Sequence, residues 1–330
     1  MIERFATRTT PTRSGPATDY PVGGAAKIVL EDAPGSCMRF SVSVGQRGLT
    51  VGVSVEQVDV GRRSIAYERA GEGPPLLLLQ GFVGDARSTW GPQIDDLSDD
   101  FTVVAWDVPG AGRSSDPPES FMLPDFADCL ADFVDILGLG RVHVVGLSFG
   151  GALALEFYRR HPGRVLSLVL AGAYAGWAGS LPSAVAEQRL EQSLRASRLP
   201  PAEFMATMLP TMFSAATTND RVREFAASLT EFHPAGFRAM ARACAADLRD
   251  VLPQVQVPTL LLYGDQDVRA PLSVGQALHA AIPNSKLVIM PGVGHVSSVE
   301  AAEQFNVEVR QFLRRLNHDL AQSQKSDRLP

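Results

Sequence analysis

Short, largely apolar runs recur along most of the chain and are separated by longer segments of mixed polarity. A continuous apolar run of four to eight residues is typical of a strand that is buried on both faces of a sheet. The runs are residues 76–79, 102–106, 142–147, 165–170, 259–263 and 286–290. Between them, segments such as 125–137 place apolar residues at helical spacing. Strands that alternate with helices predict a mostly parallel sheet flanked by helices.

Upstream of these runs, residues 51–60 and 64–70 alternate in part and flank a turn at Gly61, which predicts a hairpin and brings the expected sheet to eight strands. The strand pattern stops between 174 and 250, where several helical stretches are separated by prolines. We interpret this segment as a helical cap inserted after the sixth strand. The expected organisation is a disordered N-terminal extension at 1–45, a core at 46–173 and 251–317, the cap at 174–250, and a flexible tail at 318–330.

Composition narrows the class of protein. The chain has 330 residues and a formal net charge of −6 with mixed signs, which argues against a nucleic-acid or polybasic membrane surface. No apolar run is long enough to span a bilayer, and the N-terminus lacks the apolar segment of a secretory signal. Three widely spaced cysteines fit a reduced compartment. We therefore expect a cytoplasmic protein, monomer or homodimer, that acts on a small molecule.

The most informative motif lies at the end of the run 142–147. Gly146, Ser148 and Gly150 form a Gly-x-Ser-x-Gly motif, and a helical stretch follows directly. A strand, a sharp turn and a helix are the context that a nucleophile elbow requires, and the free N–H groups of a helix N-terminus suit a developing oxyanion. The alternative is a Gly/Ser turn that only joins a strand to a helix.

A nucleophilic serine needs a base, and the base needs an orienting acid. Of six histidines, only His295 lies in a glycine-flanked loop after the last predicted strand. Asp265 and Asp267 both follow the preceding strand, and we favour Asp267 because it lies further into the loop that faces the histidine. Turn chemistry alone also explains aspartates at such positions. We predict Ser148, Asp267 and His295 as a catalytic triad.

The substrate pocket is expected under the cap, where flexible methionines and aromatic rings would form an adaptable apolar lining. For each of these residues the alternative is simple burial of the cap against the core. No Cys/His cluster has the spacing of a metal site, so we expect neither a metal nor a cofactor. The candidate pocket residues are Gln80, Trp177, Met208, Met212, Phe213 and His233.

In order along the chain, these motifs resemble those of the α/β-hydrolase superfamily, within it the capped serine hydrolases that include enol-lactonases and carboxylesterases. The segments that carry the resemblance are 80–82, 107–114, 146–151, 264–267 and 294–295. The resemblance implies the triad named above and an oxyanion hole formed by the backbone N–H groups of Phe82 and Phe149. Gln80 stands where many such enzymes have histidine, which changes the hydrogen bonding of the loop behind those donors. A polar strand-end residue satisfied by nearby backbone is the alternative for Gln80.

These observations predict a hydrolase that cleaves a small carboxylic ester, thioester or lactone through an acyl-enzyme. A serine at the nucleophile position excludes the relatives that use aspartate there. Similar chains use the same triad for C–C bond hydrolysis, cofactor-free oxygenation, or a biosynthetic acyl transfer or cyclisation, and these remain alternatives. A non-catalytic receptor for a small ligand is a further alternative, because the fold alone does not fix the reaction.

Overall fold

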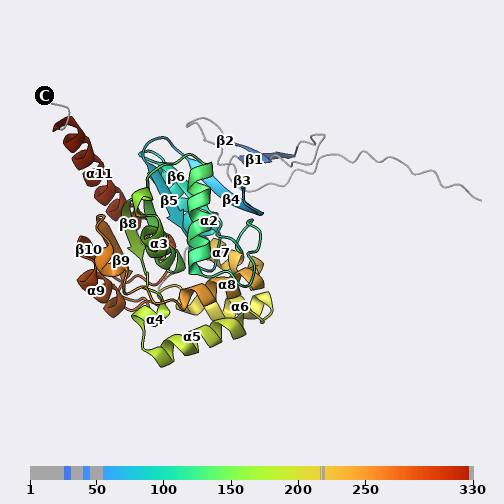
Figure 1. Ribbon diagram of the computed structural model, residues 1–330. Coiled ribbons are helices and arrows are strands. Elements are labelled where there is room, and N and C mark those ends of the chain that lie inside the picture. Colours follow the sequence, from blue (N-terminus) through green and yellow to red (C-terminus); the bar gives the residue numbers. More distant parts are fainter. Residues whose placement is uncertain (1–25, 31–39, 45–54, 216, 218–219, 327–330) are drawn as a thin grey trace, which may run out of the picture. The chain divides into compact units, whose positions relative to one another are not determined.

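The computed structural model describes residues 26–30, 40–44, 55–215, 217 and 220–326 (Figure 1). The chain divides into two compact units, Met1–Gly52 and Val53–Pro330. In the first unit, β1 (Ala26–Leu30) and β2 (Phe40–Val44) pair as antiparallel strands of a separate two-stranded sheet. The other residues of the extension that we expect to be disordered lie outside the described residues.

The second unit is built on one eight-stranded sheet, as the hydrophobic pattern predicts. Its strands lie in the order β10-β9-β8-β7-β5-β6-β4-β3. At the end of this order, β3 and β4 form an antiparallel hairpin, and β4 runs antiparallel to β6. The remaining pairs are parallel. The strands are β3 (Val55–Val60), β4 (Arg63–Ala70), β5 (Pro75–Leu79), β6 (Thr102–Trp106), β7 (Val142–Leu147), β8 (Val165–Ala171), β9 (Thr259–Gly264) and β10 (Ser285–Met290).

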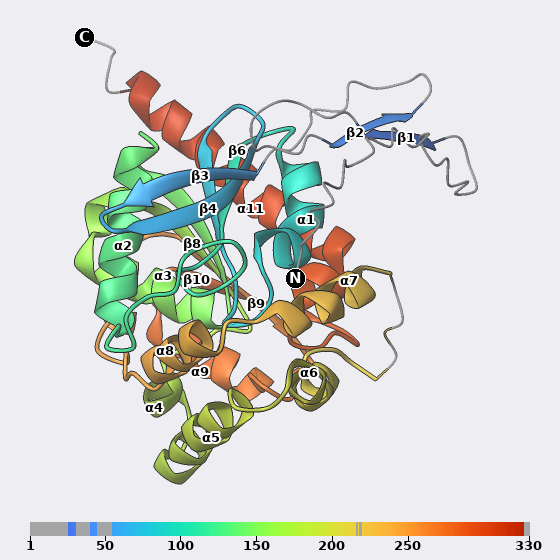
Figure 2. The same cartoon turned by 90° about the vertical axis from the view of Figure 1, so that its right-hand side faces the viewer.

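Helices cover both faces of this sheet. Figure 2 shows α2 and α3 on one side of the strands and α1 and α11 on the other. The strands β5, β6, β7, β8 and β9, each of which has a neighbour on both sides, are buried along almost their whole length, as expected for runs without polar alternation. The helices outside the insertion that follow strands of this sheet are α1 (Ala86–Leu97), α2 (Leu123–Ile136), α3 (Phe149–Arg160), α9 (Leu272–Ala281), α10 (Ser297–Glu300) and α11 (Ala302–Ser326).

A helical insertion separates β8 from β9, where the strand pattern stops in the sequence. Figure 1 shows α4, α5, α6 and α8 grouped at one end of the sheet. The insertion comprises α4 (Trp177–Ser180), α5 (Ser183–Ala196), α6 (Pro201–Met208), α7 (Asp220–Ser228) and α8 (Pro234–Cys244). At the C-terminus, α11 continues to Ser326, past the boundary at 317 that we expect between the core and the tail.

The buried carboxylate of Asp107 holds together the loops that follow β5 and β6. One of its oxygens accepts a hydrogen bond from the N–H of Ala86 at 2.7 Å, and the other accepts from the N–H of Arg113 at 2.8 Å. Burial raises the pKa of Asp107 to about 6, and the two N–H donors only partly oppose that rise. The loop after β5 is thereby fixed beside the end of β7, where the candidate nucleophile lies.

Candidate active site

Ser148 occupies a strained turn between β7 and α3. Its backbone has φ 54° and ψ −111°, and it is the only non-glycine residue with positive φ among the described residues. The flanking glycines are required by close approach: a Cβ on Gly146 would lie 2.3 Å from the carbonyl oxygen of Gly150, and one on Gly150 would lie 2.1 Å from that of Leu79. Strain of this kind costs about 1–3 kcal/mol and is concentrated at functional sites. The turn therefore has the geometry of a nucleophile elbow.

His295 and Asp267 form a buried pair. Nδ1 of His295 lies 2.8 Å from Oδ2 of Asp267, and both side chains are almost completely excluded from solvent. The other carboxylate oxygen, Oδ1, accepts hydrogen bonds from the backbone N–H groups of Arg269 and Ala270, each at 2.8 Å. Asp267 follows β9 and His295 follows β10, which are parallel neighbours, so both loops leave the same edge of the sheet. The pair is thus locked by its own loop.

Ser148 and His295 line the same pocket, which we call the serine pocket. The cavity measures only about 10 Å³, which is room for about one water molecule. The N–H groups of Phe82 and Phe149 donate to no backbone carbonyl among the hydrogen bonds of the described chain. The residues of the pocket wall are Gly81, Phe82, Val83, Leu147, Ser148, Met212, Phe225, His295 and Val296.

The predicted pocket residues are only partly brought together. Met212 lines the serine pocket, whereas Met208 lines a separate hollow in the insertion. Phe213 packs edge-on against Phe225, with ring centroids 5.5 Å apart, and lies behind the pocket wall. His233 points away to Asp116, whose carboxylate is 2.7 Å from its Nδ1.

Gln80 and Trp177 support the loop that carries Phe82. Gln80 is buried, and its Nε2 donates to the carbonyl oxygen of Gly84 at 2.8 Å, which closes the loop 81–84. The indole of Trp177 packs edge-on against the ring of Phe82, with centroids 6.0 Å apart. Both residues are therefore placed behind the candidate oxyanion donor, and neither lines the serine pocket.

Sequence reasoning missed a carboxylate that ties the insertion to the histidine loop. Glu300 on α10 accepts a hydrogen bond from the N–H of Gly294 at 2.9 Å, next to His295. The same carboxylate accepts from the N–H of Ser214 and from the hydroxyl groups of Ser214 and Thr217. No motif marks Glu300, although its place five residues after the histidine was a usable signal. The contacts fix the position of the insertion beside His295.

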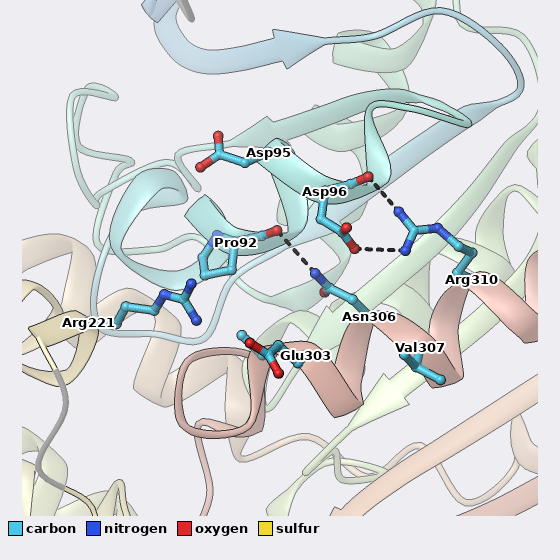
Figure 3. Close-up of a pocket in the computed structure, with 9 residues that line it drawn as sticks. Pro92, Asp95, Asp96, Arg221, Glu303, Asn306, Val307 and Arg310 are labelled. Atoms are coloured by element: carbon cyan, nitrogen blue, oxygen red, sulfur yellow. Dashed lines mark hydrogen bonds and ion pairs between the residues drawn. The ribbon is translucent and has the colours of Figure 1, made fainter. Parts of the chain in front are cut away.

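A larger hollow of about 480 Å³ lies between α1 and α11, away from the serine pocket (Figure 3). Some of its polar groups pair with one another: Arg310 pairs with Asp96 at 2.9 Å, and the amide of Asn306 donates to the carbonyl oxygen of Pro92 at 3.1 Å. Within the described ranges, no three His, Cys, Asp or Glu side chains are grouped to hold a metal ion. No helix in the described part of the chain is both long and apolar enough to cross a membrane.

Comparison with known proteins shows the family. Residues 74–302 match the family model described as alpha/beta hydrolase fold. The chain belongs to the alpha/beta hydrolase family. It is 31% identical over 242 residues to a poly(3-hydroxyalkanoate) depolymerase of Ectopseudomonas oleovorans, covering 72% of this chain and 84% of that protein. It is 29% identical over 238 residues to a putative carbamate hydrolase, RutD, of Stutzerimonas stutzeri, covering 70% and 89% of the two chains.

Solved structures agree with this placement. A thermophilic esterase from Thermogutta terrifontis superposes with a TM-score of 0.72 at 28% identity, covering 80% of this chain and 99% of that one. The predicted membership of the alpha/beta hydrolases, the predicted fold class and the prediction of an alpha/beta-fold hydrolase are confirmed.

Proposed function

We propose that this alpha/beta hydrolase is a serine hydrolase of a small carboxylic ester, thioester or lactone, with Ser148, His295 and Asp267 as its triad. The observation that carries the proposal is the juxtaposition of a strained serine and a buried, carboxylate-bound histidine on one pocket wall. The similarity to a poly(3-hydroxyalkanoate) depolymerase and to the structure of an esterase supports an ester substrate.

In the proposed reaction, the hydroxyl of Ser148 attacks the substrate carbonyl while Nε2 of His295 takes its proton. Asp267 accepts the Nδ1–H of the imidazole and stabilises the imidazolium that forms. The N–H groups of Phe82 and Phe149 receive the oxyanion, and each such donor contributes about 10²–10³-fold to kcat. His295 then protonates the leaving group, and water repeats the sequence to release the acid.

The serine pocket also implies a requirement for movement. Its volume of about 10 Å³ does not accommodate an acyl chain. Met212 and Phe225, which the insertion supplies to the wall, are the side chains that would shift to admit one. The insertion would then act as a cap whose packing sets the acyl length.

The test is hydrolysis of 4-nitrophenyl acetate, butyrate and octanoate together with a γ-lactone, comparing His295→Ala with the matched variant His233→Ala. His233 lies at the surface on Asp116, outside the serine pocket. We expect His295→Ala to lose about 10³-fold or more in kcat/KM and His233→Ala to retain the activity of the unmodified chain. Equal activity in both variants would refute the proposed base.

A further inference from the structure

A second pocket in the insertion is built around two arginines. It has a volume of about 230 Å³, and we call it the arginine pocket. Arg189 comes from α5, and Arg269 comes from the loop that also carries Asp267. Hydroxyl and amide groups of Gln192, Thr207 and Thr211 complete much of its polar wall. No carboxylate is among the residues that line it, all of which the structure describes.

Among the described residues, the groups that contact the guanidinium of Arg189 are neutral. Its Nη1 donates to the hydroxyl of Tyr174 at 2.6 Å and to the carbonyl oxygen of Arg269 at 3.0 Å. The guanidinium also lies over the rings of Tyr174 and Trp177, with its carbon 5.5 and 5.8 Å from their centroids. These contacts orient the cation but leave its charge uncompensated, because aromatic rings and carbonyl groups supply only partial negative charge.

Arg269 is held in the same way. Its Nη1 donates to the hydroxyl of Thr211 at 2.8 Å, and its guanidinium carbon lies 5.6 Å from the centroid of the Phe82 ring. Burial lowers the pKa of Arg269, and the nearby positive charge of Arg189 lowers it further, while Tyr174 and Asp267 partly oppose this fall. Asp267 lies on the same loop, but its oxygens form hydrogen bonds with His295 and with two backbone N–H groups, and it forms no ion pair with the guanidinium of Arg269.

Neither arginine forms an ion pair within the part of the chain that the structure describes. Two like charges that are held close together and partly desolvated repel each other, and an arginine removed from water normally finds a carboxylate or phosphate. The planar, fixed guanidinium groups are pre-organised for such an anion. The position of the pocket indicates the source of this anion, because the arginine pocket adjoins the serine pocket. Arg269 packs on Phe82, and Thr211 precedes Met212 in the chain. Both Phe82 and Met212 line the serine pocket.

We propose that the arginine pocket binds a free carboxylate of the substrate, so that the preferred substrates are esters or lactones that carry a second, ionised carboxyl group. This inference rests on the proposed hydrolase function. It makes Arg189 and Arg269 determinants of specificity, which hold the far end of the substrate while the reacting carbonyl lies at Ser148.

The test compares acidic esters with neutral esters of equal chain length: mono-4-nitrophenyl adipate with the hexanoate, and mono-4-nitrophenyl suberate with the octanoate. The measured quantity is the ratio of kcat/KM for the acidic ester to that for the neutral ester. We expect Arg189→Gln to lower this ratio about tenfold or more, as for the loss of a hydrogen bond between charged groups. Arg195→Gln is the matched control, because Arg195 lies on the same helix but is exposed and pairs with Glu191 at 3.6 Å.

A binding experiment separates failure of this inference from failure of the proposed function. Adipate is titrated calorimetrically into Ser148→Ala and into Ser148→Ala/Arg189→Gln, so that no turnover is needed. Adipate binding that is lost in the double variant, together with the lower ratio, supports the assignment. Binding without any change of the ratio would identify a site for a free anion, and would overturn the substrate carboxylate. Absence of adipate binding would overturn the site itself. If the unmodified chain did not hydrolyse neutral esters at all, the proposed hydrolase function would be refuted instead.

Discussion

Replacement of Asp267 by asparagine separates the role of this residue in catalysis from its role in the loop. In Asp267→Asn, the amide oxygen still accepts from the N–H groups of Arg269 and Ala270, each at 2.8 Å in the native loop. The amide nitrogen then takes the place of Oδ2, which lies 2.8 Å from Nδ1 of His295. Because an amide nitrogen can only donate, Nδ1 must become an acceptor and the imidazole proton moves to Nε2. Nε2 is then unable to accept a proton from Ser148.

The magnitude follows from this tautomer change. A substitution of this kind lowers kcat by about 10⁴-fold in serine proteases, which corresponds to about 5.5 kcal/mol of lost transition-state stabilisation. The Tm of Asp267→Asn should change little, because the hydrogen bonds from the N–H groups of Arg269 and Ala270 are both kept. Asp267→Ala removes all three bonds and leaves two buried N–H groups without a partner, at about 1–3 kcal/mol each. We therefore expect Asp267→Ala, but not Asp267→Asn, to lower Tm strongly.

The assay is kcat/KM for 4-nitrophenyl butyrate together with thermal unfolding. Asp265→Asn is the matched control, because Asp265 follows the same strand but accepts hydrogen bonds from exposed groups, the N–H of Gly292 at 2.7 Å and the side-chain amide of Gln266 at 3.2 Å. We expect the control to keep its activity within about threefold. The reasoning would be refuted if Asp267→Asn retained activity within tenfold, or if Asp265→Asn lost it.

Three further outcomes follow from the structure. Gly172 has φ +49°, and a Cβ there would lie 3.0 Å from Nδ1 of His295, so Gly172→Ala should lower kcat and cost about 1–2 kcal/mol of stability by chemical denaturation; unchanged kcat would contradict this. Asp107→Asn should have a lower free energy of unfolding than the unmodified chain at low pH. Because the raised pKa of about 6 means that the folded state favours the protonated carboxyl, this difference in free energy of unfolding should shrink by about 2–3 kcal/mol as pH rises from 4 to 6. A difference that stays constant with pH would refute this prediction. Met212→Ala should raise the ratio of octanoate to butyrate kcat/KM about tenfold, as expected for room for about two more CH₂ groups at ~0.8 kcal/mol each; an unchanged ratio would show that Met212 does not limit the acyl length.

The sheet was predictable because its central strands are short apolar runs with no competing period. The nucleophile elbow was predictable because its backbone geometry requires particular residues. Only glycine fits at positions 146 and 150, on either side of Ser148, and both glycines are visible in the sequence. The pairing of His295 with Asp267 was expected from two loops at one sheet edge, and the hydrogen bond between them is present.

The pocket wall was less accessible to sequence reasoning. The helical pattern of the insertion does not determine which face of each helix meets the core, so Met208 and Met212, four residues apart, line different pockets. Phe225 lies far along the chain from the motifs, and no pattern in the sequence marks it as a pocket residue. The arginine pocket combines α5 with the loop after β9, and no local pattern connects the two segments.

Covalent labelling is the most direct test of whether Ser148 is the nucleophile. The unmodified chain and Ser148→Ala are treated with a fluorophosphonate, and the intact masses and the modified peptide are measured. We expect one adduct on Ser148 of the unmodified chain, none on the variant, and loss of ester hydrolysis by about 10³-fold or more in the variant. A folded chain that takes up no label, or that is labelled at another residue while Ser148→Ala still hydrolyses esters, would contradict it.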